Sequence, residues 1–234
     1  MTPKIINLNR LPHFQGWFEA HVTVQPFRAE RALVFDEICS DLGVKSIQIQ
    51  LSRDKNMVQP MTCSTHKGKL QSTYKEVLSI AQALLANGFE VNRLKIEAHP
   101  DNQNVPIGIK DAAVLSSDNY FEHHIKVLVQ PDTSRTELLS ICEKHNAHLS
   151  KNAFKKRADG ILEYFITTRS YGMGKNDALA QFQSLLKEVE DSGTKIQKHF
   201  MEYCVFDSNI NLDDNWLDEV SPCLNCKEPC LRHA

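Results

Sequence analysis

Residues 18–24, FEAHVTV, and residues 121–127, FEHHIKV, share the pattern Phe-Glu-x-His-x-x-Val, and this repeated stretch determines the fold that we expect. Apolar and polar residues alternate in the first copy, as in a β-strand with one buried face. Phe18, Ala20 and Val22 would lie on the buried face, whereas Glu19 and His21 would lie on the other. The chain therefore uses one kind of strand twice.

The elements that follow the two strands also repeat. The spacing of apolar residues predicts a helix over 29–43, strands over 44–52 and 61–66, a helix over 70–88 and a strand over 89–99, and residues 120–206 repeat this order. Equivalent positions keep an offset of 103 to 105 residues: His21 and His124, Gly68 and Gly172, Gly88 and Gly193, Glu97 and Glu202. We therefore expect an α+β protein made by tandem duplication of a ferredoxin-like βαββαβ unit, with two antiparallel sheets in a bilobal molecule.

The boundaries follow from composition. Residues 15–100 form the first repeat and 118–207 the second, joined by a polar linker, 101–117, that contains Pro106 and Gly108. Residues 1–14 are an N-terminal extension. Residues 208–234 are a C-terminal extension, which we expect to dock through Trp216 and Leu217.

Charge and composition limit the partners. With 27 basic and 29 acidic residues the formal net charge is -2, which gives no global field for nucleic acid or an anionic membrane. The sequence contains no apolar run long enough to span a bilayer and no secretory leader, so we expect a cytoplasmic protein without membrane contact. Binding to duplex nucleic acid is not expected. Ferredoxin-like sheets often pair edge to edge, so a homodimer remains an open alternative.

The polar face of each predicted sheet carries the candidate site. Imidazoles beside carboxylates suit proton transfer and metal binding, because a carboxylate orients the ring and tunes its pKa. A solvated polar face is the alternative explanation for such a strand pattern. The catalytic candidates are His21, His124, Glu19 and Glu122, and the ligand-binding candidates are Thr23, Lys126, Ser64, His66, Glu97, Arg169 and Glu202.

The segment His21-Val-Thr23 resembles the motif of the two-histidine (2H) phosphoesterases, bilobal proteins in which two His-x-Thr/Ser motifs face each other across a groove. The resemblance implies that one of His21 and His124 is a general base and the other a general acid, with Thr23 and Lys126 holding the phosphate. The second motif departs from the pattern, because His124-Ile-Lys126 has lysine at the hydroxyl position. Residues 122–126 are also similar to the Glu-x-Glu-x-Lys strand of the triphosphate tunnel enzymes, but the alternating basic strands of those enzymes are absent.

We expect, on this basis, a small phosphoester- or nucleotide-directed hydrolase whose paired histidines share a cleft between the repeats and bind a small anionic ligand. Two alternatives stay open. The same His/Glu face suits a metal-dependent hydrolase that activates water. A ferredoxin-like module that only binds a ligand or assembles is the alternative outside the enzymes.

The C-terminal extension carries a separate cluster of Cys223, Cys226, Cys230 and His233. Thiolates and an imidazole suit tetrahedral zinc, and the C-x2-C step lets two thiolates reach one ion. An iron–sulfur cluster or reduced thiols without metal are the alternatives. We expect zinc here in a structural or accessory role.

Overall fold

A computed structural model describes residues 11–51, 58–131, 135–152 and 157–216, and the first half of the chain runs β, α, β, β, α, β. Its elements are β1 (Gln15–Val24), a short 3-10 helix η2 (Ala29–Arg31), α1 (Ala32–Asp41), β2 (Lys45–Leu51), β3 (Val58–Lys69), α2 (Leu70–Ala86) and β4 (Val91–Ala98). The short helix α3 (Ile109–Ala112) lies in the connection to the second half.

The second half has the same order of elements. It contains β5 (Tyr120–Val129), α4 (Thr136–Lys144), β6 (Ala147–Asn152), β7 (Leu162–Tyr171), α5 (Lys175–Asp191) and β8 (Lys195–Asp207), followed by the 3-10 helix η3 (Ile210–Trp216). Gly88 and Gly193 follow the long helices α2 and α5 with φ of 76° and 72°, a backbone conformation that favours glycine and that ends both helices in the same way. The α+β class and the repeated element order are as predicted.

The strands form one closed antiparallel barrel in the order β1-β3-β2-β6-β7-β5-β8-β4. Within each half the order is that of a ferredoxin-like sheet, and the halves join where β2 pairs with β6 and β4 pairs with β8. The prediction of two separate sheets in a bilobal molecule is therefore wrong. The sheet edges that would pair two copies of the chain are paired within one chain instead.

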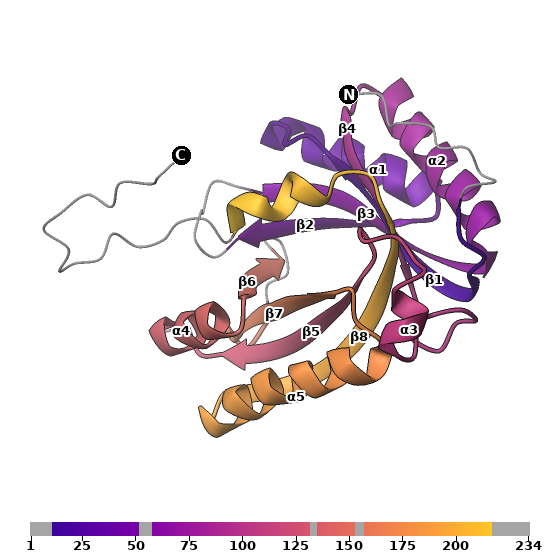
Figure 1. Cartoon of the computed structure of the whole chain (residues 1–234). Helices are drawn as coiled ribbons and strands as arrows, with labels where there is room; N and C mark the ends of the chain where they lie inside the picture. Colours follow the sequence, from indigo (N-terminus) through magenta and orange to yellow (C-terminus); the bar gives the residue numbers. More distant parts are fainter. Residues whose placement is uncertain (1–10, 52–57, 132–134, 153–156, 217–234) are drawn as a thin grey trace, which may run out of the picture.

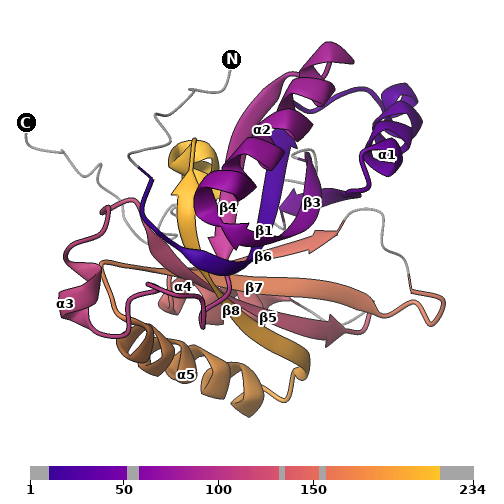
Figure 2. The same ribbon diagram turned by 90° about the vertical axis from the view of Figure 1, so that its right-hand side faces the viewer.

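Helices cover the outside of the barrel (Figures 1 and 2). α1 and α2 lie against the strands of the first half, and α4 and α5 lie against those of the second. The outward side chains of β1 pack under these helices, as predicted: Phe18, Ala20, Val22 and Val24 are each 1% exposed. The alternate residues of the same strands consequently point into the barrel.

No helix in the described part of the chain is long and apolar enough to cross a membrane.

Two strands have the opposite face inward from the one predicted. β1 pairs with β3 so that Phe18 lies opposite His66 and Ala20 lies opposite Ser64. Directly opposed residues share a face, so Ser64 and His66 lie on the helix side with Phe18. The alternation of Ile47 and Ile49 with Gln48 and Gln50 predicts the glutamines on the polar face of the sheet, but in β2 the inward residues are Ile47 and Ile49. A shift of one residue in the assumed register turns every side chain of a strand to the other face.

Candidate functional site

A cavity of about 200 Å³ lies inside the barrel and receives side chains from both halves. One part of its wall is apolar, with Ile47, Ile49, Met61, Phe165 and Phe200. The rest is polar and charged, from Glu19, His21, Thr23, Gln59, Arg93, Lys95, Glu97, Glu122, His124, His148, Ser150, Thr167, Arg169, Glu202 and Asp213. A ligand here would meet both kinds of surface.

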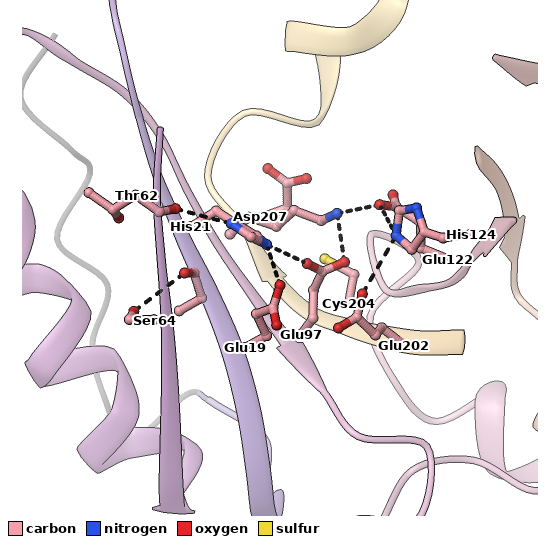
Figure 3. A network of polar contacts seen from close by, with 12 residues as sticks. Glu19, His21, Thr62, Ser64, Glu97, Glu122, His124, Glu202, Cys204 and Asp207 are labelled. Carbon is pink, nitrogen blue, oxygen red and sulfur yellow. Dashed lines mark hydrogen bonds and ion pairs between the residues drawn. The ribbon is translucent and has the colours of Figure 1, made fainter. Parts of the chain in front are cut away.

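The N-terminal half supplies a cluster around His21. The ring atom Nε2 lies 3.3 Å from Glu19 Oε1 on the same strand and 3.4 Å from Glu97 Oε2 on β4, which Figure 3 shows together. On its other side the ring donates from Nδ1 to the carbonyl oxygen of Thr62, over 3.1 Å. Because Glu19 and Glu97 are direct partners in the β1–β4 register, both carboxylates reach the same imidazole.

The C-terminal half supplies an equivalent cluster around His124. Its Nε2 lies 3.2 Å from Glu122 Oε1 and 3.5 Å from Glu202 Oε2, and Glu122 and Glu202 are partners in the β5–β8 register. The other ring nitrogen contacts the Thr167 hydroxyl at 2.9 Å, where the first cluster has a backbone carbonyl. The phenylalanine rings of the cavity wall pack beside this histidine, with the Phe200 centroid 4.9 Å away.

Lys95 joins the two clusters. Its ammonium group lies 2.6 Å from Glu97 Oε1 and 2.7 Å from Glu122 Oε1. A continuous chain of charged groups thus runs from His21 through Glu97, Lys95 and Glu122 to His124. The structure brings the two predicted histidines, His21 from β1 and His124 from β5, into one cavity.

The polar wall is completed by the guanidinium groups of Arg93 and Arg169 and by one carboxylate from the C-terminal segment. Asp213 Oδ2, in η3, lies 2.7 Å from Arg93 Nη1 and 2.5 Å from Arg169 Nη2. Arg93 also binds Asp207, and Arg169 donates from Nε to Glu122 Oε2 over 2.6 Å. The second oxygen of Asp213, Oδ1, is buried without a hydrogen-bond partner among the described residues. An internal anion therefore lies between two cations at the cavity wall.

The surroundings fix the charge of both histidines. Burial alone disfavours a charged imidazole, but Glu19 and Glu97 outweigh it and raise the pKa of His21 to about 10. The same balance, with Glu122 and Glu202, raises the pKa of His124 to about 9. Burial and the charge of Glu97 raise the pKa of Glu202 as well. Both rings are therefore positively charged near neutral pH. A general base and a general acid would instead require one neutral ring and one charged ring.

The structure places the remaining predicted residues in different surroundings. Glu19, Thr23, Glu97, Glu122, Arg169 and Glu202 line the cavity with the two histidines. Ser64 and His66 do not, because they lie on the helix side, where His66 Nδ1 is 2.5 Å from Glu76 Oε2 of α2. Lys126 is buried, and its ammonium group is 2.7 Å from Glu163 Oε2. Cys223, Cys226, Cys230, His233 and Leu217 lie outside the described residues, and no side-chain position is described for Trp216.

Sequence reasoning missed several members of the site. Arg93, Lys95, His148 and Asp213 were not among the predicted site residues. For Arg93 and Lys95 the alternation of β4 was a usable signal, since both share a face with Glu97. For Asp213 the sequence gives no such signal, because this residue is one of two adjacent aspartates in a segment without periodicity.

Comparisons with known proteins do not assign the chain to a protein family. No protein-family model matches the chain, and no curated protein matches it. A chlorite dismutase from Candidatus Nitrospira defluvii is similar at 10% identity over 81% of this chain and 91% of that chain, with a TM-score of 0.29. The regulatory subunit of aspartate kinase from Thermus thermophilus is similar at 10% identity over 76% and 97%, with a TM-score of 0.32. Likenesses this distant indicate no function.

Proposed function

We propose that the protein is a small-molecule hydrolase that acts on a phosphoester inside the barrel, with His124 as the proton donor. The observation that supports this most directly is the meeting of two imidazoles, one from each half, in a single cavity of about 200 Å³. A small molecule in this cavity would lie among largely buried charged groups, where electrostatic interactions are stronger than in bulk water. We place the reaction in the cytoplasm, because the described cysteines are free thiols.

His124 suits the role of general acid. It is held between Glu122 and Glu202 with its proton in place, and it faces the cavity beside the Thr167 hydroxyl. Donation to the leaving-group oxygen would leave a neutral ring that the hydroxyl can still orient. Glu202 is the candidate base, because a carboxyl whose pKa is raised accepts a proton from water more readily than an ordinary one.

The cavity wall also suggests how an ester would lie. Arg93 and Arg169 already share one carboxylate oxygen, so a phosphoryl group that displaced Asp213 would meet two guanidinium groups. The Thr23 hydroxyl is available on the same wall. Phe165 and Phe200 line the apolar part of the wall, so we expect the alcohol portion of the substrate to be apolar or aromatic.

The test is turnover of a panel of aryl phosphomonoesters, linear phosphodiesters and cyclic phosphodiesters by the full chain. His124→Gln should lower turnover by about a hundredfold or more, the usual contribution of a general acid. Activity that needs the charged ring should fall as pH rises past about 9, because that is where His124 loses its proton. His99→Gln is the matched control, since His99 is 58% exposed and is not among the cavity-lining residues.

Two outcomes would reject the proposal. One is the absence of turnover for every member of the panel, with and without added divalent metal. The other is turnover that His124→Gln leaves unchanged while the variant keeps its fold. If phosphate esters instead raise the melting temperature without being hydrolysed, the protein is a ligand-binding module of the non-catalytic class.

A further inference from the structure

We propose that Glu19, His21, Cys63 and Glu97 bind one divalent metal ion, with zinc as the preferred ion. The site lies in the N-terminal half of the barrel wall and does not depend on the proposed hydrolysis. An imidazole, two carboxylates and a thiolate are together a donor set that zinc accepts in tetrahedral geometry.

The spacing of the donor atoms fits one ion. His21 Nε2 lies 3.3 Å from Glu19 Oε1 and 3.4 Å from Glu97 Oε2. Ligands at the usual zinc–nitrogen and zinc–oxygen distances of about 2.1 Å are about 3.4 Å apart in a tetrahedron. The Cys63 thiol belongs to the same group, because its sulfur, a His21 nitrogen and a Glu19 oxygen all lie within 4.8 Å of one another. Cys63 also hydrogen-bonds to Glu19.

The outer contacts of these residues are those of a metal site. A metal-binding histidine usually donates its second ring N–H to a backbone carbonyl or a carboxylate, which fixes the ring and leaves the other nitrogen for the ion. His21 does this through Nδ1, which donates to the Thr62 carbonyl, and the ion displaces the proton that Nε2 carries between Glu19 and Glu97. Glu97 is oriented in a similar way, because Lys95 holds its Oε1 and leaves Oε2 facing His21.

The equivalent cluster of the C-terminal half lacks these features. Both oxygens of Glu122 are already bound by cations, Oε1 by Lys95 and Oε2 by Arg169. Thr167 lies opposite His124 in the β5–β7 register, whereas the β1–β3 pairs on either side, Ala20 with Ser64 and Thr23 with Met61, put Cys63 opposite His21. A thiol in one half and a hydroxyl in the other distinguish the proposed metal-binding cluster from its C-terminal counterpart.

Cobalt(II) provides the test, because a cobalt–thiolate bond gives an absorption band that reports directly on the sulfur. The experiment uses the full chain carrying Cys223→Ser, Cys226→Ser and Cys230→Ser, so that the C-terminal cluster contributes no thiolate. Titration should give one cobalt per chain with a thiolate-to-metal band, and added zinc should remove the band by displacing cobalt.

Variants of this chain assign the ligands. Cys63→Ser should abolish the thiolate band. Glu19→Gln should weaken cobalt binding by more than about tenfold, a loss that even the outer partners of a metal site produce when they are replaced. Its side chain is 39% exposed, so this variant should keep the fold. Glu37→Gln, at an exposed position on α1 and outside the cavity lining, is the control and should change the affinity by no more than about twofold.

The proposal is overturned if the starting chain shows no thiolate band, if the band survives Cys63→Ser, or if Glu37→Gln weakens binding as much as Glu19→Gln. Circular dichroism of each variant shows whether the fold is intact. Because the readout is binding and not turnover, a protein that fails as a phosphoesterase can still pass this test, and the reverse is also true.

Discussion

His123 and His124 are neighbours in β5 and have opposite protonation, because adjacent side chains of a strand point to opposite faces. His124 lies among carboxylates inside the barrel. His123 lies under α5, where its ring stacks on Phe182 with centroids 4.4 Å apart and both nitrogens lack a hydrogen-bond partner among the described residues. Burial and the nearby charge of His124 lower the pKa of His123 to about 4.

This difference predicts how stability changes with pH. The folded pKa of His123 is below the value of about 6.5 expected in the unfolded chain, so the unfolded state binds more protons between pH 6.5 and 4. Stability is therefore lost as pH falls through this window. His123→Leu removes the titrating group, and its advantage over the wild type should grow by about 2 kcal/mol between pH 8 and pH 5. Urea unfolding at both pH values measures the difference.

His99→Leu is the control for that measurement, because His99 lies on the surface with 58% of its side chain exposed. It should reproduce the pH dependence of the wild type. If His123→Leu shows the wild-type dependence as well, His123 is not held in its neutral form by burial.

At the scale of single residues the sequence placed both histidines and the four carboxylates beside them on the inner face. Alternation along β1 and β5 placed Glu19, His21, Glu122 and His124 correctly, because the apolar residues between them fill the core under the helices. The protonation of the rings could not be predicted, since it depends on Glu97 and Glu202 from strands that are far away in the sequence. Chemical pattern identifies residue types, whereas contacts across strands set their charge.

Among the elements, η3 contributes a site residue, Asp213, that no periodic sequence pattern predicted. Residues 210–216 add Asp213 to two arginines that belong to opposite halves, Arg93 on β4 and Arg169 on β7. A single carboxylate from a segment without regular alternation thus holds both halves of the barrel. In β2 the alternation was regular but misleading, because Ile47 and Ile49, which resemble outward core residues, line the inner cavity.

Asp213→Asn tests the role of η3. Removing the charge leaves two buried guanidinium groups without their shared anion, and breaking a buried pair in this way typically costs about 3 kcal/mol or more. Inorganic phosphate should restore part of the lost stability by binding between the guanidiniums, and thermal unfolding with and without phosphate measures this. Asp191→Asn is the control, because the Lys187–Asp191 pair is exposed and its loss should cost at most about 0.5 kcal/mol. An Asp213→Asn chain as stable as the control would contradict the prediction.

For the whole molecule, the sequence predicted the repeat of the βαββαβ unit but did not predict that the two sheets close into one barrel. Offsets of 103 to 105 residues give the same strand order in both halves, but the sequence does not state whether the outer strands meet solvent, another chain or each other. Here β2 meets β6 and β4 meets β8. The Glu/His faces of β1 and β5, which the sequence identified, become part of the inside of a barrel because these four edges pair within one chain.

Closure predicts that neither half is stable alone. A half taken by itself would expose the charged inner face and two strand edges, and it would lose packing between the halves, such as the contact of Tyr74 on α2 with Phe206 on β8. A cut between Ser116 and Ser117, in an exposed part of the linker, makes the two fragments. Produced together they should form a 1:1 complex with one cooperative melting transition, as measured by light scattering and circular dichroism. Either fragment alone should aggregate or melt without cooperativity, and a monomeric fragment with a sharp transition would show that one half can fold without the other.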